Sequence, residues 1–133
     1  MLSVNNWVTS LQTAVADATV GISIAKISGD ENFSLYITKI PPLGRVGAHF
    51  HQEGSEMYLI ESGNGTIFCA PSERPNNITK RIVTKSDVFT IQPGQIHQLV
   101  NNSSSEPLIL IFGCVPSHLD HDRVISEDLF NHN

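Results

Sequence analysis

The chain has 133 residues, 40% of them apolar and 16% charged, and a formal net charge of -5 at pH 7. These values predict one turn-rich globular domain and exclude a disordered chain or a coiled coil. The eight basic residues are spread thinly and no apolar run reaches membrane-spanning length, so we expect neither nucleic acid nor a membrane as a partner.

The N-terminal segment, residues 1–20, is expected to be a helical extension. From Asn5 to about Asp17 apolar residues recur at helical spacing, and Asn5 or Ser3 is available as an N-cap. The segment has no basic leader, and its polar residues interrupt any stretch long enough for a signal peptide. Since two cysteines are too few for a disulfide scaffold, we expect a cytoplasmic protein.

Residues 21–115 read as short β-prone runs separated by turns rich in glycine, proline and asparagine. The predicted strands cover residues 21–27, 33–40, 48–51, 56–61, 65–70, 77–84, 87–92, 96–101 and 108–113. Many short strands at close spacing predict an all-β antiparallel sandwich or barrel. Residues 116–133 are expected to form a polar C-terminal tail with a turn or two of helix on the outside.

The stretch from residue 48 to residue 63 carries the strongest chemical signal. His49 and His51 point to the same side of a strand, because side chains alternate between its faces. A Gly-Ser turn then places Glu56 at the start of the next strand, within reach of a metal held by both imidazoles. His97, on the strand after a Pro-Gly turn, supplies a third imidazole.

This set of residues resembles the two sequence motifs of the cupin superfamily. His49, His51 and Glu56 match the ligands of the first motif, and Gly63 matches its closing glycine. In the second motif the matching residues are Gly94, His97 and Asn101. Ser86 stands where the second motif usually opens with glycine, Gln92 stands where it usually has proline, and Gly44 is one position off in the first motif.

The resemblance spans residues 21–113 and implies an antiparallel jelly-roll barrel with one divalent metal inside. Three imidazoles and one carboxylate suit Fe(II), Mn(II), Ni(II) or Zn(II), with coordination sites left open. Such a centre implies a metalloenzyme acting on a small polar organic molecule, as an isomerase or epimerase, a dioxygenase, a decarboxylase or a lyase. The alternatives are a non-catalytic binding or sensor module and a metal-free structural cupin.

Several other polar residues are weighed against this centre. Tyr58 shares the face of Glu56 and is a candidate acid-base group, although packing is the more common role. Asn101 either caps a turn or supports His97. Arg45 is a candidate clamp for a substrate carboxylate, although solvent exposure is the favoured interpretation. His118 and His121 are assigned to a solvated tail and excluded from the site.

The outer faces of the strands around the site predict self-association. Strand alternation places Phe50, Met57 and Leu59 opposite the candidate metal ligands, so this sheet is apolar on both sides. A short N-terminal helix carrying Trp7 and Leu11 covers only part of such a surface. We therefore expect a two-fold homodimer that packs these faces together.

Overall fold

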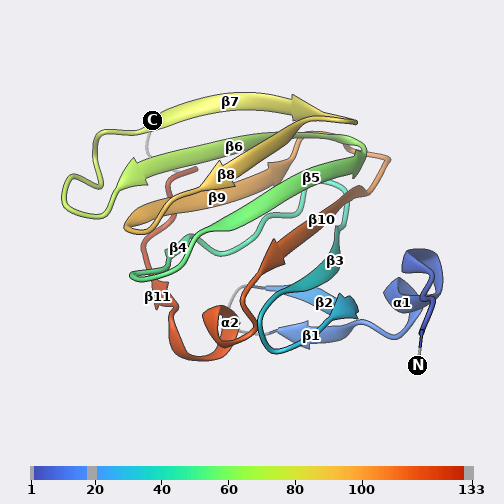
Figure 1. The fold of residues 1–133 in the computed structure, drawn as a ribbon. Helices are drawn as coiled ribbons and strands as arrows, with labels where there is room; N and C mark the ends of the chain where they lie inside the picture. Colours follow the sequence, from blue (N-terminus) through green and yellow to red (C-terminus); the bar gives the residue numbers. More distant parts are fainter. Residues whose placement is uncertain (1, 18–20, 131–133) are drawn as a thin grey trace.

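Two antiparallel β-sheets face each other in the computed structural model, which describes residues 2–17 and 21–130 (Figure 1). The strands of the first half of the chain are β1 Val15–Asp17, β2 Ile22–Gly29, β3 Ser34–Ile40, β4 His49–Phe50, β5 Glu56–Ser62 and β6 Asn64–Pro71. Those of the second half are β7 Thr79–Thr84, β8 Val88–Ile91, β9 Gln95–Asn101, β10 Leu108–Cys114 and β11 Val124–Ile125. The six-stranded sheet has the order β1-β2-β3-β10-β5-β8, and the five-stranded sheet has the order β11-β4-β9-β6-β7.

This architecture confirms the all-β antiparallel jelly-roll barrel. Each of the nine runs predicted from the sequence overlaps one of the strands β2 to β10. Strand alternation also holds on β5, where Glu56, Tyr58 and Ile60 are buried while Met57 and Leu59 are exposed. The largest apolar core lies between the sheets, and its most completely buried members are Ile40, Ile60, Leu99, Leu108 and Leu110. A smaller apolar cluster consists of Ala48, Ala70, Ile96 and Leu129.

The N-terminal helix is present but shorter than the periodicity suggested. Helix α1 spans Trp7–Gln12, and its N-cap is Asn6, whose side chain accepts hydrogen bonds from the backbone of Val8 and Thr9. The predicted continuation to Asp17 is wrong, because Val15 leaves the helix and pairs with Ile24 on β2. A β-branched residue beside an available strand edge favours this extended conformation.

The segment after β10 closes one end of the barrel. Helix α2, Ser117–His121, lies at the lower end of the molecule in Figure 1, at the level of β1 and β2, and β11 pairs with β4. The buried side chain of Gln98 anchors the rest of the segment: its oxygen accepts from the backbone of Leu129 and Phe130, and its nitrogen donates to Asp128. In this segment β11 therefore pairs with β4, and residues 128–130 are bound to β9.

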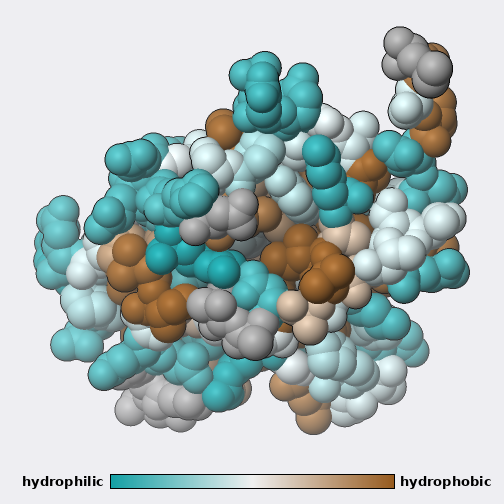
Figure 2. All heavy atoms as spheres, turned by 90° about the horizontal axis from the view of Figure 1, so that it is seen from below, coloured by the Kyte–Doolittle hydropathy of each residue, from teal (hydrophilic) through white to brown (hydrophobic). Residues whose placement is uncertain are grey.

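The surface at this end of the barrel is mixed in character. Figure 2 looks at it from below and shows hydrophobic side chains in separate groups with hydrophilic ones between them. In the described part of the chain, no helix combines the length and the apolar character that crossing a bilayer requires.

Candidate metal centre

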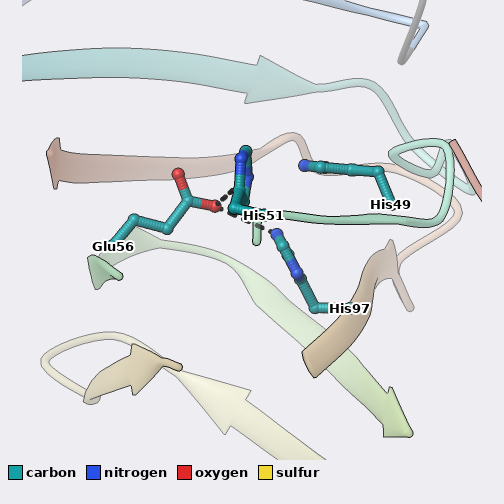
Figure 3. Close-up of side chains that lie close together, drawn as sticks. All are labelled: His49, His51, Glu56 and His97. Atoms are coloured by element: carbon teal, nitrogen blue, oxygen red, sulfur yellow. Dashed lines mark hydrogen bonds and ion pairs between the residues drawn. The ribbon is translucent and has the colours of Figure 1, made fainter. Parts of the chain in front are cut away.

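The four residues that the sequence proposed as ligands come together between the two sheets. His49 lies on β4 directly opposite His97 on β9, and Glu56 opens β5 in the other sheet. The loop from residue 51 to residue 55 joins the sheets and carries His51 at its start. All four side chains are at most 5% exposed, and Figure 3 shows them converging on a common centre.

Backbone carbonyls orient all three imidazole rings. The Nδ1 atom of His49 faces the carbonyl of Gly47 at 2.8 Å, and that of His97 faces the carbonyl of Gln95 at 3.1 Å. The Nδ1 atom of His51 faces the carbonyl of Asp122. A carbonyl only accepts, so protonation on Nδ1 satisfies these three contacts and turns each Nε2 toward the centre, where that of His97 lies 3.0 Å from Glu56 Oε1.

The separations between the candidate ligand atoms suit a transition metal. One ligand atom from each residue lies within 4.8 Å of all the others. Glu56 Oε1 lies 3.0 Å from His97 Nε2 and 3.5 Å from His51 Nε2. Bonds of about 2.1 Å to one ion would separate neighbouring ligand atoms by about 3.0–3.4 Å. The buried Nε2 of His51 has no hydrogen-bond partner, as expected for a nitrogen that binds a metal ion.

The electrostatics of the cluster keep His49 and Glu56 in the forms that bind metals. Burial, reinforced by His97, lowers the pKa of His49 to about 3, so this ring is neutral at pH 7. Burial opposes the charge of Glu56, but its close polar contacts with the rings of His118, His51 and His97 prevail and hold the pKa of its carboxyl well below the usual range. A neutral imidazole and a carboxylate are the ligand forms that a divalent ion requires.

Tyr58 belongs to the same cluster. Its hydroxyl donates a 2.6 Å hydrogen bond to Glu56 Oε1. Burial, and then the negative charge of Glu56, raise the pKa of Tyr58 well above its usual value, so the phenol stays protonated. The prediction from strand alternation placed Tyr58 on the glutamate's face, and it lies there.

A small cavity of about 30 Å³ adjoins the cluster, with His49, Glu56 and Tyr58 in its wall. Arg123 also lines it, and the guanidinium is paired with Asp17 at 2.8 Å. This space holds about one water molecule. A larger molecule therefore needs displacement of α2 or of the Arg123–Asp17 pair.

Arg45 and Asn101 lie in other surroundings. Arg45 is partly exposed, pairs with Asp128 at 2.9 Å and stacks over Phe130. The Asn101 amide donates to the carbonyls of Ile40, Pro41 and Glu106, and its oxygen accepts from the backbone of Ser103. Asn101 thus ties three chain segments together.

The assignment of His118 to a solvated tail is wrong. His118 is 3% exposed and its Nε2 lies 3.4 Å from Glu56 Oε2, whereas His121 is exposed as expected. Sequence reasoning also missed Asp122, whose carbonyl orients His51. The available signal was the i, i+4 spacing of His118 and Asp122 in "SHLDHD", which places them on one side of a helical turn.

Comparison with known protein families supports the jelly-roll fold described above. The family model described as Cupin matches residues 19–131. The putative germin-like protein 12-4 of Oryza sativa subsp. japonica is 26% identical over 95 residues. That match covers 68% of this chain and 42% of the rice protein, so the chain spans less than half of this curated relative.

Solved structures share the arrangement of strands. The capsular polysaccharide assembling protein CapF from Staphylococcus aureus aligns with a TM-score of 0.72 at 20% identity, over 86% of this chain and 34% of CapF. An uncharacterised double-stranded β-helix protein from Klebsiella pneumoniae aligns with a TM-score of 0.68 at 16% identity, over 88% of this chain and 94% of the other. Recombinant oxalate oxidase in complex with glycolate has a TM-score of 0.66 at 15% identity, over 87% and 61%. At these identities the likeness concerns the fold.

Proposed function

Because this chain belongs to the cupin family, we propose that its buried polar cluster binds one divalent transition metal and that the protein is a metal-dependent enzyme. The substrate class that we propose is a small polar organic molecule. The proposed ligands are three imidazoles and one carboxylate, those of His49, His51, Glu56 and His97. Fe(II), Mn(II), Ni(II) and Zn(II) all suit this set.

One observation carries the proposal. Three backbone carbonyls hold the Nδ1 atoms of three different rings, so the Nε2 atoms point inward, and those of His51 and His97 lie 3.5 and 3.0 Å from Oε1 of Glu56. This arrangement leaves the buried Nε2 of His51 without a hydrogen-bond partner, which costs about 1–3 kcal/mol. A polar cluster with a purely structural role would gain nothing from such a cost. A bound cation would remove that cost.

The chain's own residues suggest how the site would work. A bound divalent metal would supply Lewis acidity toward a carbonyl or a water molecule. Tyr58 holds a proton 2.6 Å from Glu56 and lines the adjoining cavity, so it is our candidate acid-base group. Arg123 offers a positive charge in the same cavity once its pair with Asp17 opens.

Metal analysis tests this proposal directly. Protein purified without a histidine tag should contain about one transition metal ion per chain by mass spectrometry. Alanine at His49, His51, Glu56 or His97 should each lower that content, while His121→Ala, on the exposed side of α2, should not. Thermal unfolding of each variant shows whether it is folded. Full occupancy in folded His49→Ala and His97→Ala proteins would contradict the assignment.

Activity screens separate the enzyme from the sensor alternative. Metal-loaded protein is tested for oxygen uptake and for isomerisation or cleavage of small carbonyl compounds, with Tyr58→Phe as the comparison. An enzyme should lose turnover in Tyr58→Phe at unchanged metal content. A sensor should retain a small ligand through purification and show no turnover, which would favour the binding-module alternative.

We also propose a two-fold homodimer in the cytoplasm. On the outer face of the six-stranded sheet, Leu59 pairs with Ile111 and Val88 across neighbouring strands, and Leu59 and Val88 are exposed. Such an apolar row supports a subunit contact. Phe50 is not part of it, because it lies on β4 in the other sheet and packs near Leu129. Both cysteines are free thiols, which supports a reducing compartment.

A further inference from the structure

Helix α2 brings a further histidine to the cluster from the segment after the barrel. Although α2 has only five residues, His118 is only 3% exposed, whereas His121 on the same helix is exposed. The ring of His118 stacks on that of His51, with centroids 3.5 Å apart and planes inclined by 26°. His118 therefore adjoins one of the proposed ligands over a whole ring face.

The two oxygens of Glu56 have different surroundings. Oε1 faces Tyr58, His97 and His51, as described above. Oε2 points the other way, and His118 Nε2 lies 3.4 Å from it. His118 Nδ1 also faces a carboxylate, that of Asp122, but at the longer distance of 3.8 Å, so we assign the proton of the ring to Nε2. Oε1 of Glu56 therefore faces the metal centre, and Oε2 faces helix α2.

The loop between His51 and Glu56 is shaped to admit the His118 ring. A Cβ atom at Gly54 would lie 2.6 Å from His118 Nδ1, so any side chain at this position would displace the imidazole. One helical turn after His118, the carboxylate of Asp122 accepts backbone hydrogen bonds from Gln52, Glu53 and Gly54. His118 and Asp122 therefore lie on the same side of one helical turn, where His118 packs against the loop and Asp122 binds the loop's backbone.

Both ring nitrogens of His118 are buried, and neither makes a hydrogen bond of good geometry. An unsatisfied buried polar group costs about 1–3 kcal/mol, so its retention at a site needs an explanation. Shortening of the 3.4 Å contact between Nε2 and Oε2 would remove this cost for Nε2. The unsatisfied Nε2 and its nearness to Oε2 together point to a role of His118 at Glu56.

We propose, on the basis of the function proposed above, that His118 is a positioning residue of the metal centre. Its Nε2–H holds Oε2 of Glu56, so that Glu56 binds the metal through Oε1 alone. Stacking of its ring on His51 fixes the orientation of that ligand as well. Through these contacts α2 becomes part of the centre, and the strength of metal binding depends on its docking.

A second metal ion held by His51, His118 and Asp122 is the competing explanation, since their ligand atoms also lie within 4.8 Å of one another. The geometry disfavours it. Lone pairs lie in the planes of imidazole rings, so two rings stacked nearly face to face do not aim at one ion. Oδ2 of Asp122 already accepts two backbone hydrogen bonds.

We test the proposal with replacements of His118 that differ in the position of their hydrogen-bond donor. Glutamine places an amide N–H near the Nε2 position, asparagine places it near Nδ1, and phenylalanine keeps the stacking ring without a donor. His121→Gln is the matched control on the exposed side of α2. The metal-free proteins are titrated with Co(II), and affinity, stoichiometry and visible absorption are measured, with circular dichroism to verify folding.

The proposal predicts one Co(II) per chain and a graded effect. His118→Phe and His118→Asn should bind about 10- to 100-fold more weakly than the wild type, as is usual when a group that orients a ligand is lost. Their visible bands should also weaken, because a released carboxylate can bind through both oxygens and raise the coordination number. His118→Gln should stay within about threefold of the wild type in affinity, and His121→Gln should be unchanged.

Three results would overturn the inference. Wild-type affinity and spectrum in folded His118→Phe protein would show that His118 has no role in positioning. Equal weakening in the glutamine and asparagine variants would show that the ring acts by packing alone. Two Co(II) ions in the wild type and one in His118→Phe would establish the second metal site. If the wild type binds no Co(II), the proposed function itself fails and the inference falls with it.

Discussion

At the scale of single residues, the cluster is distinguished by how many polar groups share one buried carboxylate. Glu56 receives a hydrogen bond from Tyr58 and lies within 3.5 Å of three imidazole nitrogens, two at Oε1 and one at Oε2. In a low-dielectric interior such a group is stable only while its partners remain. Replacement of any one partner should therefore change the interactions of Glu56 with the other partners.

Tyr58→Phe provides the simplest measurement of this dependence. The change keeps the ring but removes the hydroxyl that donates to Glu56, and a hydrogen bond to a charged group contributes about 1.5–3 kcal/mol. We expect the free energy of unfolding of the metal-free protein to fall by that amount in urea titrations. An unchanged midpoint and slope would show that water replaces the hydroxyl without loss.

The two cysteines should be unreactive in the native protein. Burial raises the pKa of Cys69 to about 11 and that of Cys114 to about 12. At pH 8 the thiolate fractions are then about 10⁻³ and 10⁻⁴, and only the thiolate attacks alkylating reagents. Labelling with iodoacetamide should be slow at pH 8, faster as the pH rises toward 11, and rapid for both residues in urea. Rapid native labelling at pH 8 would contradict these shifts.

At the scale of elements, turns and the segment after β10 decide how the cluster is held. The Pro-Gly turn before β9 is linked to a proposed ligand, because the backbone N–H of Gly94 donates to the carbonyl of His51 at 2.7 Å. Gly94 has a φ of 77°, which a side chain rarely adopts. The turn that positions His97 thus also positions His51.

Ser86 offers a test of turn strain. It stands where the second cupin motif usually has glycine, and its φ of 78° lies in the left-handed region. Left-handed backbone costs a residue with a side chain about 1–2 kcal/mol, partly offset by the extra entropy that glycine has when unfolded. We expect Ser86→Gly to raise the free energy of unfolding by about 0.5–1 kcal/mol, measured by chemical denaturation.

The control for Ser86→Gly is Ser105→Gly, in an exposed loop where φ is not positive. That change should be neutral or slightly destabilising, since it only adds freedom to the unfolded chain. Destabilisation by Ser86→Gly comparable to that of the control would show that the serine conformation carries no strain.

At the scale of the whole molecule, the outer face of the six-stranded sheet is the surface that predicts assembly. Leu59→Glu introduces a charge into the apolar row beside Ile111 and Val88 and should dissociate the proposed dimer. In sedimentation velocity at micromolar concentration, the wild type should have twice the 14.6 kDa mass of the chain and the variant the mass of one chain. Ile82→Glu, at an exposed position on β7 in the other sheet, should leave the dimer intact. A wild type of 14.6 kDa would refute the proposal.

The sequence by itself determined the strands and the four candidate ligands. Both are encoded locally: alternation of polarity and β-branched residues mark strands, and spacing of two residues places His49 and His51 on one side of the chain. The N-terminal helix was also recognisable from its local pattern. Its end was not, because Val15 pairs with β2, and local periodicity carries no information about pairing between strands.

The tertiary structure alone decided the role of the last residues. Polar composition made "SHLDHD" resemble a solvated tail, yet folding back across the barrel end buries His118 against Glu56 and lets Asp122 orient His51. It likewise separated Phe50 from Leu59 by assigning β4 and β5 to different sheets. Contacts between residues about 70 positions apart depend on chain topology and long-range packing, and short-range patterns carry no record of them.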